Sequence, residues 1–445
     1  MADIRPFRGV HYNRSAGDLA ELICPPYDII SPQLRQELYR RNEHNFVRLE
    51  YEQELPGDTD SQNKYTRSAA LLQQWLAQGV LTADGAPAIY RHDHYFTLNG
   101  QEHRRQGLTA LVKLEEWDKK VVRPHEGTLA APKGDRLNLL WALQANTSPI
   151  FALFEDSGQQ VASLLAAAQG EPLLDIDRDG EQHRVWAITG EAADEIGRLL
   201  ADQPLYIADG HHRYESALKY RQERRACSPG APADEPYDFV MMTLVDFSDP
   251  GLVILPAHRL VRGVSPSALD RLRSSLPSFF KIEEVPVNSA DTAGQITELL
   301  ARPEGQVKLV LFGLGDNLII LRLRDVAAAA RMMPNFHSEL YKRLDVSIVD
   351  HVVLEKMLGM QDRESAALSY SYDIGDTIGK VMSREYGLAI LLNPVKARDI
   401  KSIADAGDRM PRKSTYFSPK LPAGLVIYRW AQAAPGTLTP ERRLC

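Results

Sequence analysis

The segment 205-LYIADGHHRYESALKYR-221 carries the densest set of groups suited to binding an anion. Its apolar residues favour a strand that ends near Ala208, and Gly210 permits a tight turn. A helix is expected to start at His211 or His212. Unpaired N–H groups and the helix dipole at such a start attract negative charge, so the segment predicts a phosphate-binding turn.

Two side chains flank this turn. Arg213 offers a forked cation that suits phosphate oxygens, and Asp209 is placed to cap the helix or to hold a metal ion. The alternative is an ordinary capped helix with exposed histidines. Two adjacent histidines beside an arginine, after a buried strand, favour the functional interpretation, with His211 and His212 as candidate acids or nucleophiles.

The segment 123-RPHEGTLAAPKGDRLNLL-140 is a second candidate. Its glycines and prolines predict an irregular loop, and such loops often carry function. Glu126 is a candidate base, and Glu126 or Asp135 is a candidate magnesium ligand beside Asp209. A solvated polar connection is the alternative. The predicted nucleotide contacts here are Arg123, His125, Thr128, Lys133 and Arg136.

The sequence offers three further candidate sites. Asp28, after the Pro-Pro pair of 24-CPPYDIISP-32, is a possible general base, although a turn-stabilising carboxylate is the simpler interpretation. His258 and Arg259 follow the strand-like 251–256 and are expected at a sheet edge, with a solvent-facing pair as the alternative. The loop 413-KSTYFSPK-420 offers Lys413, Thr415 and Lys420 to a phosphate, or is a structured loop held by its aromatics.

The surrounding pattern predicts the elements that position these groups. Ser31 before Pro32 predicts a helix start, and residues 63–79 predict an amphipathic helix. Residues 87–100 and 102–117 predict a hairpin that turns at Asn99-Gly100. Strand and helix patterns then alternate over 149–247.

Together these patterns predict an α/β (α+β) protein with two domains. The first, at residues 1–262, would hold the phosphate turn. The second, at 263–445, would be a smaller α+β domain with a closing tail loop at 410–422. The length of 445 residues suits more than one domain.

Composition narrows the class of function. A net charge of −7 disfavours broad nucleic-acid binding. Three widely spaced cysteines indicate a reducing compartment and no structural zinc site, and the N-terminus predicts no signal peptide, so we expect a cytoplasmic protein. No apolar run is long enough for a membrane span, and the familiar glycine-rich nucleotide motifs are missing. The oligomeric state stays open.

Four motifs, in this order, carry a resemblance: RPHEGTL, ADGHHRYESAL, ILPAHRLV and KSTYFSPKLPAGLVI. The chain resembles the domain-of-unknown-function 1015 family over nearly its whole length. The GHHR turn is similar to the phosphate-binding turn of ParB proteins and sulfiredoxin. The resemblance therefore implies a ParB/sulfiredoxin-like N-terminal half, in which the Pro-rich turn brings Asp28 close to Gly210.

The same resemblance implies three activities to weigh. Sulfiredoxin needs a cysteine where this chain has His211, which argues against sulfinic-acid reduction. ParB proteins bind CTP and grip DNA with a helix-turn-helix, which we do not find. Free-serine kinases use a carboxylate near the Pro-rich turn, and Asp28 stands there, although those kinases use Glu.

The leading hypothesis is a nucleotide-dependent small-molecule kinase that uses ATP or ADP with Mg²⁺, with free L-serine as a candidate acceptor. The alternative is a ParB-like regulatory protein that binds CTP or ATP without transferring phosphate. A phosphatase that uses His211 or His212 is a third, weaker option.

Overall fold

The hairpin predicted around Asn99-Gly100 forms the middle of the largest sheet in the computed structural model, which describes residues 1–302, 307–360 and 367–430. Strands β4 (Ala88–Leu98) and β5 (Gln101–Lys113) pair antiparallel. Asn99 (φ 50°) and Gly100 (φ 75°) both adopt the left-handed conformation that a two-residue hairpin turn requires. The predicted hairpin is confirmed.

The sheet has nine strands in the order β6-β11-β8-β12-β5-β4-β10-β9, with β1 beside β5. Only the pairs β11–β6 and β12–β8 are parallel. The strand–helix alternation of 149–247 therefore builds a mixed sheet, and the predicted α+β class is confirmed. The remaining strands are β1 (Ile4–Arg5), β6 (Val122–Arg123), β8 (Ile150–Phe154), β9 (Leu174–Arg178), β10 (Glu181–Thr189), β11 (Leu205–Asp209) and β12 (Phe239–Asp246).

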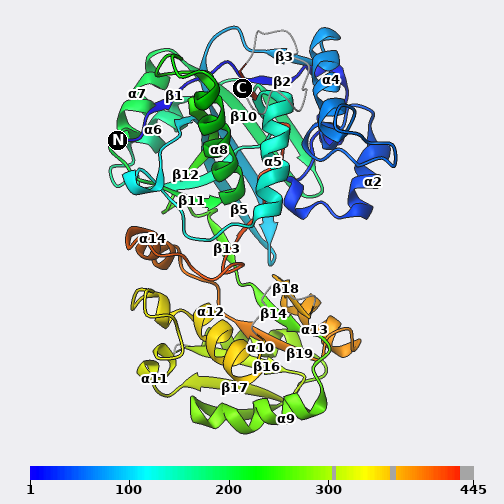
Figure 1. Cartoon of the computed structure of the whole chain (residues 1–445), viewed down its shortest axis with the longest axis vertical. Helices are drawn as coiled ribbons and strands as arrows, with labels where there is room; N and C mark the ends of the chain where they lie inside the picture. Colours follow the sequence, from blue (N-terminus) through cyan, green and yellow to red (C-terminus); the bar gives the residue numbers. More distant parts are fainter. Residues whose placement is uncertain (303–306, 361–366, 431–445) are drawn as a thin grey trace. The chain divides into compact units, whose positions relative to one another are not determined.

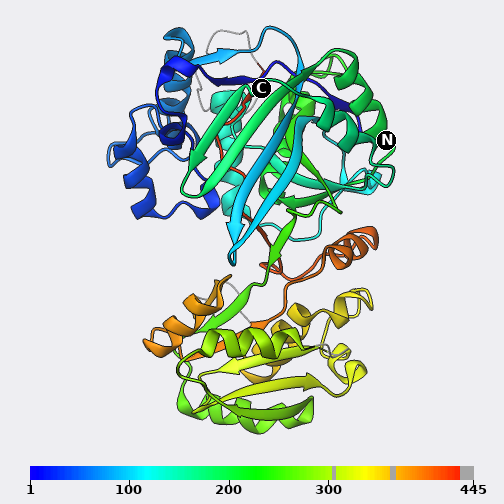
Figure 2. The same ribbon diagram turned by 180° about the vertical axis from the view of Figure 1, so that it is seen from behind.

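Different segments cover the two faces of this sheet (Figures 1 and 2). Leu108, Ala110 and Met242 pack among helical side chains on one face. Tyr90 and Leu111 pack on the other face with apolar residues of the segment 425–428. The alternation along each strand places its apolar residues on both faces, so the sheet is buried between two layers. The covering helices are α5 (Ala130–Leu143), α6 (Gln160–Ala167), α7 (Glu191–Leu200) and α8 (His211–Cys227).

A cluster of short helices near the N-terminus has its own core of Leu38, Phe46 and Trp75. Ser31 accepts a hydrogen bond from the amide of Leu34 and caps α2, as predicted. The elements here are α1 (Leu19–Leu22), α2 (Pro32–Arg41), α3 (Val47–Glu50), α4 (Lys64–Ala77) and the 3-10 helices Arg14–Ala16 and Tyr27–Ile29. Two small strand pairs lie alongside, β2 (Val10–Tyr12) with β3 (Leu81–Ala83) and β7 (Ala145–Asn146) with β21 (Tyr428–Arg429).

One prediction about local structure is wrong. Residues 130–143 form helix α5, although the glycines and prolines there predicted an irregular loop. Pro132 lies in the first turn of the helix, where its missing N–H would have no partner anyway. Gly134 lowers the intrinsic helix propensity, but burial of Leu139 and Leu143 offsets that cost.

The chain divides into two compact units whose segments interleave along the sequence. The first contains Met1–Arg123, Thr128–Leu252 and the chain from Pro419 onward. The second contains Pro124–Gly127 and Val253–Ser418. These units differ from the predicted domains 1–262 and 263–445, because a short loop and the returning tail cross between them. Residues 431–445 of the predicted second domain lie outside the described part.

The second unit is built on a six-stranded antiparallel sheet in the order β15-β17-β16-β19-β14-β18. Its core includes Leu260, Val310, Ile320 and Leu391. The strands are β14 (His258–Val261), β15 (Phe280–Pro286), β16 (Lys308–Phe312), β17 (Asn317–Leu323), β18 (Leu368–Ser371) and β19 (Leu388–Leu392). Strand β13 (Val253–Leu255) pairs separately with β20 (Tyr416–Ser418).

Helices complete the second unit. They are α9 (Pro266–Ser275), α10 (Thr292–Ala301), α11 (Val326–Ala330), α12 (Asp345–Ile348), the π-helix Val349–Met357, α13 (Ile374–Met382) and α14 (Ala397–Asp405). The second unit also has the 3-10 helices Leu276–Ser278 and Tyr341–Arg343, and the first unit has Trp117–Lys119 and Pro236–Asp238. None of the described helices combines the length and apolar composition needed to cross a bilayer.

Candidate functional site

The predicted strand–turn–helix segment forms as expected. Strand β11 ends at Asp209, and α8 starts at His211. Gly210 between them has a φ of 95°, which glycine adopts without steric cost. A Cβ on Gly210 would lie 3.0 Å from Nε of Arg213, so the arginine folds back over the turn. The positive end of the helix dipole lies at this start of α8, which makes it a place that attracts an anion.

Asp209 is the charge centre of the turn. Its Oδ1 accepts from Nζ of Lys420 at 2.6 Å, and its Oδ2 accepts from Nη2 of Arg213 at 2.7 Å. Burial by itself would raise the pKa of Asp209, but Lys420 and Arg213 lower that pKa well below its usual range. Asp209 makes no capping hydrogen bond to α8. The prediction that it caps the helix is wrong, because both its oxygens face cations.

Arg213 is engaged inside the protein. Besides Asp209, it donates through Nη1 to the carbonyl oxygen of Pro149, while its buried Nε has no hydrogen-bond partner. Its fork therefore joins the turn to the chain just before β8. The sequence predicts that this fork binds phosphate oxygens. In the structure, its contacts with Asp209 and Pro149 hold the turn in place.

The Pro-rich turn lies beside this centre. Asp28, in the 3-10 helix Tyr27–Ile29, has its Oδ2 4.0 Å from Nζ of Lys420, and its side chain is one of the exposed groups of the site. Lys420 therefore connects Asp28 with Asp209. The neighbouring Tyr27 stacks under the guanidinium of Arg136, 4.0 Å from the ring centre, and burial raises the pKa of its hydroxyl.

The segment after residue 127 packs on the first turns of α8. The amide of Leu129 donates to Nε2 of His212 at 2.9 Å. Thr128 and Lys133 both bind the carboxylate of Glu215, at 2.6 and 2.9 Å. The structure thus brings the two predicted segments together. The charge of Lys133, which we had assigned to phosphate, is neutralised by a carboxylate.

Arg136 and Asp135 lie deeper than predicted. Arg136 is 5% exposed and binds Asp135 and the carbonyl oxygen of Glu50. Asp135 also accepts from Tyr65 at 2.8 Å and pairs with Lys64 at 3.0 Å. Burial opposes ionisation of Asp135, but Arg136 and Lys64 still lower its pKa to about 2. Both predicted ligands therefore form a buried structural network.

Two other predicted contacts of the first unit lie close to the turn. Arg123 donates through Nε to the carbonyl oxygen of Lys120 and through Nη1 to the hydroxyl of Tyr206 at 3.3 Å. His211 is 8% exposed at the start of α8 and contributes to the lowered pKa of Asp209. Arg123 thus supports strand β11, and His211 supports the turn.

A separate cluster forms within the second unit. Oε1 of Glu126 accepts from the amides of Ser414 and Thr415 and from the Thr415 hydroxyl, each at 3.1 Å. Nε2 of His125 lies 2.9 Å from the Thr415 hydroxyl. Lys413 is exposed and has a left-handed backbone. Glu126 thus anchors the tail loop, whereas the structural alternative considered for that loop had it held by its aromatics.

The expectation for His258 and Arg259 is wrong. Both are fully buried in β14, which lies between β18 and β19 inside the second sheet. Arg259 pairs with Asp350 at 3.2 Å, and Nδ1 of His258 accepts weakly from the amide of Leu392 at 3.4 Å. The preceding strand ends at Leu255, so the two residues begin a second strand and do not end the first.

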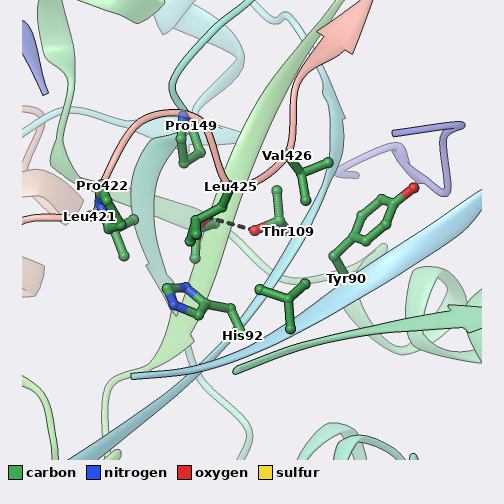
Figure 3. A pocket seen from close by; sticks show the side chains of 10 residues that line it. Tyr90, His92, Thr109, Pro149, Leu421, Pro422, Leu425 and Val426 are labelled. Carbon is green, nitrogen blue, oxygen red and sulfur yellow. Dashed lines mark hydrogen bonds between the residues drawn. The ribbon is translucent and has the colours of Figure 1, made fainter. Parts of the chain in front are cut away.

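The sheet face behind Pro149 is closed. The cavity there has a volume of about 20 Å³, room for a single water molecule. His92 and Thr109 line it from the sheet, and Leu421 and Pro422 cover it (Figure 3). A small-molecule ligand therefore has no space between this part of the sheet and the tail.

Comparison with known proteins assigns the chain to a family. A family model described as "Protein of unknown function (DUF1015)" matches residues 4–347, well over half of the chain. The chain belongs to this family. No match was found among curated proteins. The DUF1015 assignment confirms the resemblance inferred from the four motifs.

Three solved structures match this DUF1015 protein weakly. A conserved hypothetical protein from Pyrococcus furiosus has 12% identity and a TM-score of 0.35, with 72% of this chain and 95% of that chain covered. A free serine kinase in complex with AMP has 13% identity and a TM-score of 0.35, covering 71% and 92%. SbnI with a C-terminal truncation, from Staphylococcus aureus, has 13% identity and a TM-score of 0.34, covering 72% and 87%.

Sequence reasoning missed three groups of the candidate site. Glu215 binds Thr128 and Lys133, Tyr27 stacks on Arg136, and the carbonyl oxygen of Pro149 receives Arg213. Glu215 had a usable signal, because a residue four positions after His211 lies on the same helix face. The other two had none, since they lie far away in sequence.

Proposed function

We propose that this protein binds a nucleoside phosphate at the start of α8 and transfers a phosphoryl group to an alcohol. ATP and ADP are the donors to test first, and free L-serine is the first acceptor. One observation carries the proposal. The left-handed Gly210 presents the first amides of α8 beside two cations, Arg213 and Lys420, and beside the exposed carboxylate of Asp28.

Phosphoryl transfer requires positioning and charge stabilisation more than covalent chemistry. The amides at the start of α8 would hold phosphate oxygens. Nζ of Lys420 lies 2.6 Å from Asp209 and 4.0 Å from Asp28, and it would shift from Asp28 toward a bound phosphate while keeping its contact with Asp209. Arg213 would act as a positioning residue that keeps Gly210 in its turn.

Asp28 is the proposed acceptor of the hydroxyl proton. It is exposed, lies next to Lys420 and belongs to a short, Pro-preceded helix that restricts its position. Glu126, the other candidate, already accepts three hydrogen bonds from the tail loop through one oxygen. Asp28 is therefore the better candidate base.

The three carboxylates predicted for Mg²⁺ do not fit that ion. Asp209 gives one oxygen to each of two cations, and Asp135 is held by Lys64, Tyr65 and Arg136. Glu126 anchors the tail. Hard cations need several free oxygen ligands, so no step is assigned to a protein-held magnesium ion.

The test is a transfer assay on the full-length protein. It is incubated with ATP, ADP or CTP, Mg²⁺ and a pool of amino acids and sugars, and new phosphomonoesters are sought by mass spectrometry. Production of O-phosphoserine or another phosphomonoester that is lost in Asp28→Asn supports the proposal. Nucleotide affinity should fall at least about tenfold in Arg213→Ala and stay unchanged in Arg224→Ala, on the same helix. Unchanged nucleotide affinity in Arg213→Ala would refute the site.

A second candidate is a nucleotide-responsive binding protein without transferase activity. It is favoured by one observation: Arg213, Lys420, Lys133 and Arg136 are each paired with a protein carboxylate. A site whose cations are already paired with carboxylates can bind a nucleotide, but it leaves little positive charge to stabilise the transition state of phosphoryl transfer. Tight nucleotide binding with no phosphorylated acceptor would select this candidate.

A further inference from the structure

Strand register gathers four polar side chains on one face of the large sheet, and the nucleotide proposal uses none of them. Alternate residues of a strand share a face, so His92 and His94 of β4 point to one side, as do Glu181 and His183 of β10. The two strands are antiparallel, and His94 lies directly opposite His183. The face is therefore rich in imidazoles.

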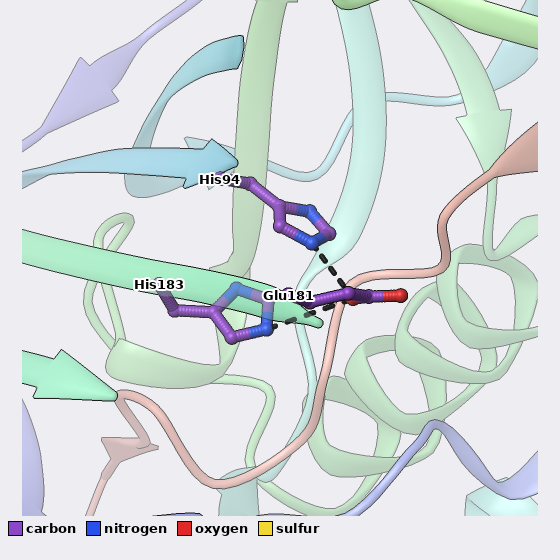
Figure 4. Close-up of side chains that lie close together, drawn as sticks. All are labelled: His94, Glu181 and His183. Atoms are coloured by element: carbon purple, nitrogen blue, oxygen red, sulfur yellow. Dashed lines mark hydrogen bonds and ion pairs between the residues drawn. The ribbon is translucent and has the colours of Figure 1, made fainter. Parts of the chain in front are cut away.

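Three of these side chains converge (Figure 4). Nε2 of His94 lies 2.8 Å from Oε2 of Glu181, and Nε2 of His183 lies 3.8 Å from the same oxygen. One ligand atom from each of the three residues lies within 4.8 Å of the others. The two histidine side chains are 1% and 4% exposed, whereas that of Glu181 is 37% exposed. The cluster is thus buried on the histidine side and open on the glutamate side.

We propose that His94, Glu181 and His183 bind one transition-metal ion of the Zn²⁺ class. Imidazole nitrogens and carboxylate oxygens lie 2.0–2.2 Å from zinc, which separates tetrahedral ligand atoms by about 3.3–3.6 Å. The two distances to Glu181, 2.8 and 3.8 Å, bracket this separation, and all three ligand atoms lie within 4.8 Å of one another, so rotations of the side chains would bring them onto one ion. Two imidazoles and one carboxylate do not suit Mg²⁺ or Ca²⁺, which prefer all-oxygen sites.

His92, which is not one of the three ligands, supports this assignment through its contact with His183. Its Nε2 lies 3.1 Å from Nδ1 of His183. When Nε2 of His183 binds a metal ion, its Nδ1 carries the proton and donates it to His92. Metal-bound histidines characteristically donate their second ring N–H in this way, which fixes the ring orientation.

Arg105 should weaken metal binding, so its substitution gives a test that is specific to this site. The arginine lies opposite His94 on β5 and donates through Nη2 to Nδ1 of His94 at 3.0 Å. The metal-free His94 therefore carries its proton on Nε2, facing Glu181. Metal binding at Nε2 moves the remaining proton to Nδ1, so Arg105 must turn away and keep its other contact, the carbonyl oxygen of Pro419. A guanidinium also repels a divalent cation.

Three protein ligands leave a fourth coordination position, which a water molecule or a ligand would occupy. The partly exposed Glu181 marks the side from which the ion and this fourth ligand would enter. The site is distinct from Asp209, Arg213 and Lys420. Its existence does not depend on the proposed kinase activity.

The experiment is a metal titration of the full-length protein after treatment with a chelator. Zn²⁺ binding is measured by calorimetry, and Co²⁺ binding by the visible absorption that reports tetrahedral coordination. We expect one equivalent of metal for the wild type and affinity more than about tenfold weaker in His183→Gln and in His94→Gln. Arg105→Gln should bind at least about threefold more tightly, because the competing donor and its charge are removed.

His103→Gln is the matched control. His103 lies on the neighbouring strand β5, stacks on Phe96 and is not a member of the cluster, so its substitution should leave the affinity unchanged. Circular dichroism of each variant checks its fold, and the wild-type titration stands without any variant. A wild type that binds no stoichiometric Zn²⁺ or Co²⁺, or equal binding by all variants, would overturn the proposal.

Discussion

At the scale of residues, Asp209 organises the candidate site because each of its two carboxylate oxygens binds a cation. Its contacts with Lys420 and Arg213 are 2.6 and 2.7 Å long, and the Lys420 side chain is 9% exposed. A buried ion pair contributes little net stability, but removal of one partner leaves an uncompensated charge. The site should therefore be sensitive to loss of either cation.

Lys420→Met tests this charge balance. Because the folded-state pKa of Asp209 is depressed, its contribution to stability is present above the unfolded pKa, near 4, and is lost as the pH falls through the folded value. We expect Lys420→Met to lower the free energy of unfolding by about 3 kcal/mol at pH 7 and by a smaller amount at pH 3, where Asp209 is already protonated in the unfolded chain. Urea unfolding at the two pH values measures this difference.

Lys219→Met is the control for that substitution. Lys219 is exposed on α8 and pairs loosely with Glu223 at 3.6 Å. Its loss should change stability by less than about 0.5 kcal/mol at either pH. An equal effect of the two substitutions would show that Lys420 does not neutralise a buried charge.

Gly210→Ala tests the backbone of the turn. An alanine at a φ of 95° is strained, and its Cβ would push the guanidinium of Arg213, 3.0 Å away. We expect a loss of about 1–2 kcal/mol in stability and a clear loss of nucleotide affinity. Thermal unfolding and nucleotide titration measure the two effects. Gly230→Ala, at an open position, should change neither.

At the scale of elements, the site depends on how two helices start. Helix α8 starts directly after β11, which fixes the amides beside Asp209. Helix α2 starts just after the 3-10 helix that carries Asp28. A loss of order at the start of α2 should therefore spread to Asp28, which is three residues before Ser31.

Ser31→Ala tests this dependence. Oγ of Ser31 accepts from the amide of Leu34 at 3.1 Å, and Pro32 occupies the first turn. Loss of this cap should cost about 1 kcal/mol and speed amide hydrogen exchange around Asp28. Ser31→Asp keeps an acceptor at the same position and should restore protection. Equal rates of amide exchange around Asp28 in the two variants would show that the order of Asp28 does not depend on the Ser31 cap.

At the scale of the whole molecule, one carboxylate in each unit has a shifted pKa, and the two shifts have opposite signs. Burial raises the pKa of Asp345, in the second unit, to about 7. The unfolded chain releases that proton near pH 4. The stability that Asp345 contributes is therefore full below pH 4 and is lost as the pH rises through 7. Asp209, in the first unit, acts in the opposite sense below pH 4.

Asp345→Asn should remove this response of the second unit. The variant is expected to be more stable than the wild type at pH 8, by on the order of 1 kcal/mol, and equal to it at pH 4. Thermal unfolding at the two pH values measures this change. A stability gain that is the same at both pH values would show that ionisation of Asp345 is not its cause.

The sequence by itself determined features that depend on neighbouring residues. Ser31 before Pro32 specified the start of α2, and Asn99-Gly100 specified the hairpin turn. The apolar run before Asp209, followed by Gly210, specified the strand, turn and helix start. These predictions succeeded because capping, turn conformation and side-chain periodicity act over a few residues.

The tertiary structure decided which distant groups meet. Lys420 and Asp209 are far apart in sequence, and only the returning tail brings them together. Arg136 looked like a ligand but is buried against Glu50 and Tyr27. Asp135 also looked like a ligand, but it is held by Arg136, Lys64 and Tyr65. The spacings His92-x-His94 and Glu181-x-His183 each place two side chains on one strand face, yet their convergence required the register of β4 and β10. Register and long-range pairing arise from packing of the whole core, so no local pattern encodes them.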